Sequence, residues 1–160
     1  MKKFLIILIL MLVSLVTYGY KYGAELGFGV GSNATNFRMD GHTKFFTWMP
    51  GFHATANFPL NDVVTVGASY FYSPRGQNNY GAKSTLQAFS LQVGLITSDY
   101  ATASIGVETT QPTFNGTKYD RRYHAIGTVW IYPFTNFKHF GLFGSGSTSF
   151  RVNVGVAVRF

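Results

Sequence analysis

The chain has 160 residues, of which 46% are hydrophobic, 18% aromatic and only 12% charged, and its formal net charge is +7. Soluble domains hold about 25% charged residues, so a chain of this length, which is one domain rather than two, needs something other than charge to cover its surface, and lipid is one candidate. The absence of cysteine excludes disulfides, a lipoprotein anchor and thiolate metal sites.

The first nineteen residues have the composition of a secretion signal. Lys2 and Lys3 form a basic start, residues 4–16 are almost entirely apolar, and small residues stand at the end of the segment. The apolar run is too short for a comfortable membrane-spanning helix, which needs about 20 residues. We therefore predict a cleaved signal peptide over residues 1–19 and one domain over residues 20–160. An uncleaved anchor helix is the alternative.

The remainder is dominated by apolar residues at every second position, the pattern of strands with two unlike faces. Pro50 falls within the second such segment, where it predicts a bulge or a strand that starts after it. The sixth segment is ambiguous in phase, and we prefer the phase that turns Tyr123 and Ile131 outward and Trp130 inward. The seventh is weakly patterned and is included because this type of barrel needs an even strand count. The predicted strands span residues 20–31, 46–58, 64–72, 89–95, 101–108, 123–132, 137–144 and 150–160.

Connection lengths and charge positions both favour a transmembrane barrel. Long polar connections alternate with tight turns, as they do where long loops occupy one rim of a barrel and short turns the other. None of the six acids falls on an apolar stripe, and a Lys or Arg facing lipid would cost about 2–4 kcal/mol at mid-depth. The other faces are rich in Gly, Ser and Thr, which suits a narrow lumen. We predict an all-β, up-and-down antiparallel transmembrane barrel of eight strands; a secreted soluble β-protein is the alternative.

The last strand carries the most specific pattern. Val154, Val156, Val158 and Phe160 alternate with small or charged residues, and the chain stops on that phenylalanine. Together with the alternation along residues 20–160, this resembles the small OmpA/OmpX-type outer-membrane barrels. The resemblance implies a place in the bacterial outer membrane, among its lipid and lipopolysaccharide. It also implies that the barrel-assembly machinery reads Phe160, Val158 and Val156 as the assembly signal, although many members have an aromatic residue where this chain has Val158.

Four charged residues on the non-apolar faces are predicted to form a charge network in the lumen: Glu25, Glu108, Arg151 and Arg159. The first and last strands must pair for closure, so we expect Glu25 to meet Arg151, with Glu108, Arg159 and Lys21 able to join them. An unpaired charge there would be costly. We interpret the network as a satisfied interior plug, because eight strands barely enclose their own side chains. A gate for a small channel is the alternative.

The predicted outer loops are basic, with seven bases against two acids and a net charge of +5. Such a rim could bind phosphates of outer-leaflet lipid or an anionic host surface, or be no more than a solvated edge. The basic residues of this predicted outer rim are Arg38, Lys44, Arg75, Lys83, Arg121 and Arg122, with Lys118 beside them.

The histidines do not fit a catalytic or metal-binding pattern. One family of lipid A deacylases in barrels of this size uses a lipid-facing His, a Ser two residues later and a Glu, whereas here Thr55 follows His53 and Ile126 follows His124. Four scattered histidines also lack the spacing of metal ligands. The basic charge comes without the aromatic platform that nucleic-acid binding needs.

We therefore expect a monomeric, non-enzymatic barrel without cofactor, metal or nucleic acid. Its expected role is to stabilise the envelope or to present surface loops for attachment to a host or cell-surface ligand. A narrow small-solute pore and a lipid A-modifying enzyme are the alternatives within the barrel class.

Overall fold

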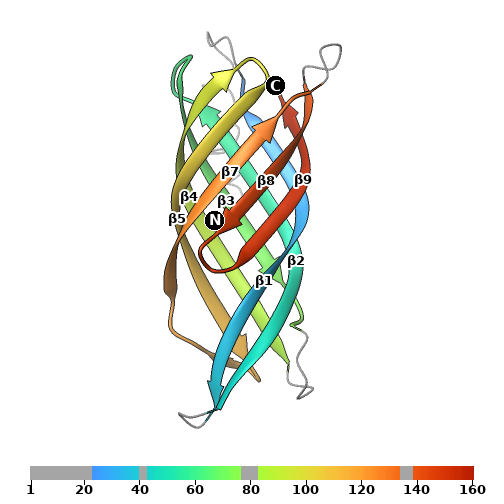
Figure 1. Cartoon of the computed structure of the whole chain (residues 1–160), viewed down its shortest axis with the longest axis vertical. Coiled ribbons are helices and arrows are strands. Elements are labelled where there is room, and N and C mark those ends of the chain that lie inside the picture. The colour runs from blue at the N-terminus through green and yellow to red at the C-terminus, as the bar shows by residue number, and fades with distance from the viewer. Residues whose placement is uncertain (1–22, 40–42, 77–82, 134–138) are drawn as a thin grey trace, which may run out of the picture.

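The structure, a computed structural model, describes residues 23–39, 43–76, 83–133 and 139–160 (Figure 1). The predicted signal peptide and Lys21 lie outside these residues. Within them, no helix is long and apolar enough to cross a membrane. The strands are β1 (Glu25–Met39), β2 (Thr43–Pro59), β3 (Val64–Ser73), β4 (Ser84–Ser98), β5 (Ala101–Phe114), β6 (Thr117–Lys118), β7 (Arg122–Ile131), β8 (Phe140–Ser147) and β9 (Arg151–Arg159).

Eight of these strands close on themselves. Strands β1 to β5 pair antiparallel in chain order. Strand β5 then pairs with β7, β7 with β8, and β8 with β9. The ring closes where β9 pairs with β1, and the two-residue β6 folds back on the end of β5. Where the ring is closed, each described strand is paired on both sides, which is the condition for placing strands in hydrocarbon. The predicted eight-stranded antiparallel barrel is confirmed.

The two faces of the wall differ as the alternation predicts. On β4, Leu91 and Val93 point outward and are 63% and 57% exposed, whereas Ser90 and Gln92 point inward and are buried. The same pattern runs round the barrel, so its outside is an apolar belt and its inside is polar. A belt of this kind is solvated by lipid. The preferred phase of the sixth predicted strand is also confirmed, because Trp130 of β7 lies inside and is 1% exposed.

Several details of the strand prediction are wrong. Strands β1, β4 and β5 extend beyond the predicted bounds, to Met39, Ser84 and Phe114 respectively. Pro50 causes no bulge: β2 runs through it in unbroken register with β1, with Ser32 opposite. The ladder from β2 to β3 starts only at Phe52, so a missing amide hydrogen at Pro50 costs no bond on that side. The seventh predicted strand also lies later than expected, at Phe140–Ser147, because its glycines obscure the alternation.

The outer ends of β4 and β5 continue beyond the belt, and there the alternation inverts. Along β4, Phe89 is the last apolar residue on the outer face, and the next outward residue, Gln87, is polar and exposed. On the inner face the change is opposite, from Ser90 to the buried Ala88 and Leu86. A sheet that is apolar inside and polar outside is built for water. The inversion therefore marks where the membrane ends and a water-facing extension begins.

The wall is uneven in height at this outer end. β8 and β9 are short, and their turn is tied to its neighbours by backbone hydrogen bonds from Ala34 N to Phe150 O (3.3 Å) and from Thr148 N to Ala125 O (2.9 Å). Beyond that level β1 continues to Met39 with β2 as its only partner. Figure 1 shows the β8–β9 turn part of the way down the barrel, while the β1–β2 hairpin reaches its lower end. The result is a notch in the wall between the β8–β9 turn and the outer end of the barrel.

Candidate functional site

An ion pair joins the first and last strands inside the barrel, near the rim where Gly23 and Phe160 lie. Arg159 of β9 donates to Glu25 of β1 from Nη2 (2.7 Å) and from Nε (3.1 Å). Asn57 and Thr102 donate to the same carboxylate at 2.7 and 3.1 Å. The Arg159 guanidinium also lies 3.9 Å from the centre of the Tyr132 ring. Both charges are therefore buried with several partners each, the condition under which a buried pair is tolerated.

A layer of aromatic side chains lies next along the lumen. Trp130, Tyr132, Phe143 and Ala157 form one buried cluster, and the His53 ring meets that of Phe143 edge-on, with centroids 5.3 Å apart. The facing strands make room with glycines: a Cβ on Gly27 or Gly155 would approach the Phe143 ring to 2.8 or 2.5 Å. These inward glycines are thus required by the ring that fills the lumen.

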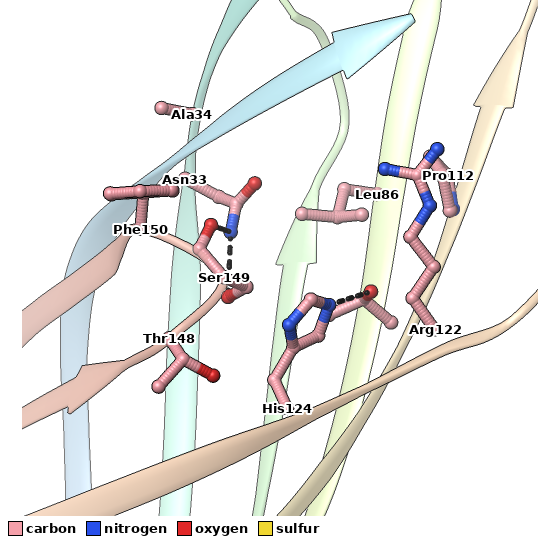
Figure 2. Close-up of a pocket in the computed structure, with 10 residues that line it drawn as sticks. Asn33, Ala34, Leu86, Pro112, Arg122, His124, Thr148, Ser149 and Phe150 are labelled. Atoms are coloured by element: carbon pink, nitrogen blue, oxygen red, sulfur yellow. Dashed lines mark hydrogen bonds between the residues drawn. The ribbon is translucent and has the colours of Figure 1, made fainter.

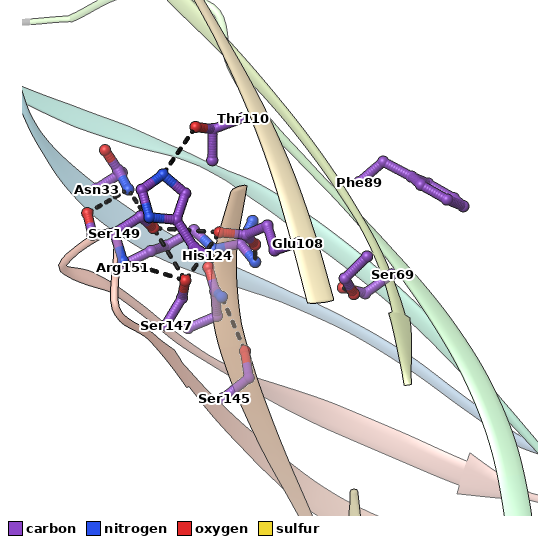
Figure 3. A network of polar contacts seen from close by, with 12 residues as sticks. Asn33, Ser69, Phe89, Glu108, Thr110, His124, Ser145, Ser147, Ser149 and Arg151 are labelled. Carbon is purple, nitrogen blue, oxygen red and sulfur yellow. Dashed lines mark hydrogen bonds and ion pairs between the residues drawn. The ribbon is translucent and has the colours of Figure 1, made fainter. Parts of the chain in front are cut away.

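A second ion pair lies beyond the aromatic layer, between Arg151 of β9 and Glu108 of β5 (Figure 3). Ser147 and Ser149 donate to the Glu108 carboxylate at 2.9 and 3.1 Å. The Arg151 guanidinium also lies 5.0 Å from the centre of the Phe71 ring. Neither charged residue is more than 1% exposed.

The structure thus brings the four predicted lumen charges together as two separate pairs. The expected contact between Glu25 and Arg151 is wrong, and the register explains why. On the closing seam, Glu25 lies opposite Arg159, whereas Arg151 lies opposite Asn33 at the far end of the shared ladder. Pairing of the first and last strands was the right premise, but antiparallel direction puts the end of β9, not its start, beside the start of β1.

The outer third of the lumen is filled by apolar side chains. Met49, Phe71, Leu86, Ala88 and Phe114 form a buried cluster, and Tyr119 packs against it. This cluster is the core of the water-facing extension. Two ion pairs, an aromatic layer and an apolar core thus follow one another along the barrel, so the described side chains fill its bore.

The notch between the β8–β9 turn and the outer end of the barrel contains a small cavity of about 160 Å³ (Figure 2). Asn33 is fixed there by two 3.0 Å hydrogen bonds, to the backbone carbonyl and the hydroxyl of Ser149. Arg122 and His124 reach the cavity from β7 and Thr110 from β5. Polar and apolar side chains therefore share the lining of the cavity, which has one cationic side chain on its wall and opens at the outer end of the barrel.

One contact in the cavity joins a base to a hydroxyl. His124 Nε2 lies 3.2 Å from Thr110 Oγ1, the spacing of a nucleophile and its general base. Such a pair needs a third group to orient the imidazole. Glu108 lies opposite His124 on the neighbouring strand, but its oxygens are used by Arg151, Ser147 and Ser149. Sequence reasoning missed this pair because its two members come from different strands with no common motif.

The predicted basic rim is divided by the uneven wall. Arg75 and Lys83 are exposed at the outer ends of β3 and β4, and Arg121 and Arg122 are exposed at the start of β7, level with the notch. Arg38 and Lys44 lie opposite each other in the β1–β2 hairpin, and their side chains lie outside the described part. Asp120 is an exposed acid beside the two arginines of β7.

The three residues predicted as an assembly signal all lie on the outer face of the closing strand. Val156 and Phe160 are 62% and 61% exposed, and Val158 is half-buried between them. The Phe160 amide donates to the carbonyl of Ala24 at 3.0 Å, which completes the β1–β9 seam. Whether they act as a signal stays a prediction.

Comparison with known proteins gives matches of fold alone. No protein-family model and no curated sequence matches the chain. The structure resembles Ail, the attachment invasion locus protein of Yersinia pestis, in complex with the heparin analogue sucrose octasulfate: TM-score 0.56, 15% identity, 86% of this chain and 99% of that chain covered.

Two further solved structures give similar values. Ail of Yersinia pestis in a phospholipid bilayer nanodisc matches with a TM-score of 0.51 and 13% identity over 86% of this chain and 99% of that one. A transmembrane β-barrel designed de novo matches with 0.52 and 13% over 88% and 98%. With its closed ring and apolar belt, the chain has the fold of the small OmpX-type outer-membrane β-barrels.

Proposed function

We propose that the protein is a sealed, non-enzymatic barrel of the bacterial outer membrane that acts through its outer end, by binding an anionic ligand at the cell surface. The observation that carries this proposal is the filled bore. Eight-stranded barrels have an interior just wide enough for side chains, and here those side chains interlock as two ion pairs, an aromatic layer and an apolar core. Function is then left to the parts that project beyond the membrane.

The chemistry of the outer end favours an anionic partner. Arg75, Lys83 and Arg121 are exposed there, and the extension that holds β3 and β4 clear of the belt presents them beyond the lipid. Arginine binds sulfate and phosphate groups through paired N–H donors. The similar barrel Ail was crystallised with the heparin analogue sucrose octasulfate, so a sulfated or phosphorylated saccharide is the ligand class that we propose.

Binding of sucrose octasulfate to the nanodisc-held protein tests this proposal. The triple variant R75Q/K83Q/R121Q should weaken binding strongly, and the matched variant R75K/K83R/R121K, which keeps every charge, should retain most of it. Affinity should fall as salt is raised, because exposed charges are screened over about 8 Å at physiological ionic strength. Unchanged binding in the glutamine variant would reject the basic rim as the site and leave an envelope-structural role.

The same preparation separates the other barrel functions. A sealed bore should give no single-channel steps in planar bilayers, whereas a pore would give them. Among the described residues, the His124–Thr110 contact is the feature that favours an enzyme. A change in lipid A mass in cells expressing the protein, lost in T110A, would establish acyl chemistry at this pair.

Biogenesis follows from the same proposal. We infer that residues 1–19 are removed as a signal peptide, that the barrel-assembly machinery recognises the strand ending in Phe160, and that the finished barrel is a monomer among outer-membrane lipid and lipopolysaccharide. The outward, seam-closing position of Phe160 supports the second of these inferences.

A further inference from the structure

The apolar belt is interrupted by a groove on the outside of the barrel, over β5, β7 and β8. Its volume is about 1080 Å³, at the upper end of the roughly 300–1,000 Å³ typical of ligand sites. Ala125, Gly127 and Gly146 form its floor, Ile105 and Val107 one of its sides. The opposite side is formed by Phe150 and Val152, which are 80% and 64% exposed.

The glycines of this floor are not required by the backbone or by packing. A Cβ on Gly146 would meet nothing within 4 Å, and one on Gly127 would come no closer than 3.7 Å, to Ser104 O. Inward glycines differ: a Cβ on Gly106 would approach Leu91 O to 1.9 Å. A strand interior is weakened by glycine, so two lipid-facing glycines side by side keep open a space that the fold itself does not need.

The groove and the cavity of the notch lie next to each other, because Thr148 and Phe150 line both. The β8–β9 turn therefore lies between an apolar space at membrane depth and a cavity at the outer rim that has polar side chains on its wall. Arg122 stands on the polar side. The nearest buried acid, Glu108, is neutralised by Arg151, and exposed Asp120 is outnumbered by Arg121 and Arg122.

We propose that this groove and cavity bind one molecule of an anionic membrane lipid, with an acyl chain on the glycine floor and the phosphate against Arg122. The groove lies within the lipid-facing belt, so its occupant comes from the membrane. The apolar floor fits a hydrocarbon chain, and the cation at its outer end fits a phosphate. The proposal needs the barrel to span a membrane but does not need the rim to bind a surface ligand.

Native mass spectrometry of the protein released from nanodiscs tests the proposal. The nanodiscs hold equal amounts of phosphatidylglycerol and phosphatidylcholine with identical chains. The protein should retain one phosphatidylglycerol in preference to phosphatidylcholine, by about tenfold, because both lipids carry a phosphate but only phosphatidylcholine brings an ammonium group, which Arg122 repels. R122Q should remove that preference while leaving retention of a lipid, because it alters the headgroup contact alone.

Filling the groove is the second arm. G127L/G146L should abolish retention of both lipids, and G146L alone, at the position with free space, keeps the test open if the double variant does not fold, as judged by heat-modifiable gel migration. A54L adds the same bulk on the outer face of β2, across the barrel, and should change nothing. Binding of sucrose octasulfate should persist in G146L, which separates this site from the basic rim.

Three outcomes would overturn the proposal. Lipid retention that survives G146L and G127L/G146L would show that the groove is not the site. Equal loss in A54L would show a general effect of bulk on the belt. A protein dimer that disappears in G146L, with no lipid adduct, would assign the groove to a second copy of the chain.

Discussion

Arg159 and Glu25 lie opposite each other on the two strands that close the barrel, and their side chains form an ion pair inside it. The pair therefore ties the last strand to the first at the point where the ring could open. Asn57 of β2 and Thr102 of β5 also donate to the Glu25 carboxylate. This carboxylate therefore links residues of four strands. A charge pair in this place does more than balance charge, because it fixes which residues of the seam face each other.

We predict that losing either member of this pair destabilises the barrel more than losing both. E25M or R159M should lower the free energy of unfolding by about 3–5 kcal/mol, because each leaves a buried charge without its counterion. E25M/R159M should cost less than either single variant, because it leaves no buried charge without a counterion. Urea-induced unfolding from lipid vesicles measures all three, and simple additivity would contradict the proposed coupling.

The aromatic layer should be a second source of stability. F143A removes a ring packed against Trp130 and His53 and over two glycines that cannot fill the gap, so we expect a loss of about 3–5 kcal/mol. L142A is the matched control, since Leu142 is next to Phe143 in sequence but is 53% exposed on the lipid side, where acyl chains can occupy the vacated space. Equal costs in the same vesicle assay would show that the bore is loosely packed.

The final phenylalanine should matter for assembly more than for the folded state. Phe160 is 61% exposed and its one described polar contact is made by its backbone amide, so F160S should leave the urea midpoint of the refolded barrel almost unchanged. In cells it should lower the amount of heat-modifiable protein in outer membranes, because the assembly machinery would read the altered strand poorly. V156T, two pleats earlier on the same face, measures the effect of lost apolar surface elsewhere in the motif. Normal outer-membrane levels of F160S would remove Phe160 as a signal.

Period-two alternation predicts the barrel and the direction of Trp130, because a wall with lipid on one side and a narrow bore on the other imposes a two-residue period. The strand number needs the further condition of an even count, because the seventh strand is weakly patterned. The alternation cannot predict which charged residues form ion pairs inside the bore. Which arginine meets Glu25 depends on the register of the seam, and Arg159 and Arg151 occur on the same face of the same strand with identical local patterns. The register depends on how all the strands of the ring pair, so it cannot be predicted from the sequence pattern of one strand.

The outer extension was missed for a different reason. The predicted strand bounds leave residues 110–120 in a connection between two strands. In the structure, Asn115 and Gly116 have left-handed backbones, with φ of 46° and 82°, and form the turn between β5 and β6. Asn-Gly is the strongest short signal for such a hairpin. Leu86 and Ala88 were missed because their alternation has the opposite phase to that of the belt. When a strand leaves the membrane, its apolar residues change from the outer face to the inner face. A prediction that assumes one phase of alternation therefore ends the strand at the point where the phase changes.

The position of that exchange is the last prediction. Gln87 and Leu91 both point outward from β4, four residues apart, one on each side of the expected membrane boundary. L91K places a charge in the belt and should cost about 2–4 kcal/mol, whereas Q87K should cost about 0–1 kcal/mol because it lies near or beyond the interface. Folding equilibria in vesicles of one lipid composition compare the two directly, because both variants carry the same new side chain. A cost for Q87K equal to that of L91K would move the boundary outward and place the inverted segment inside the membrane, where its polar outer face has no physical justification.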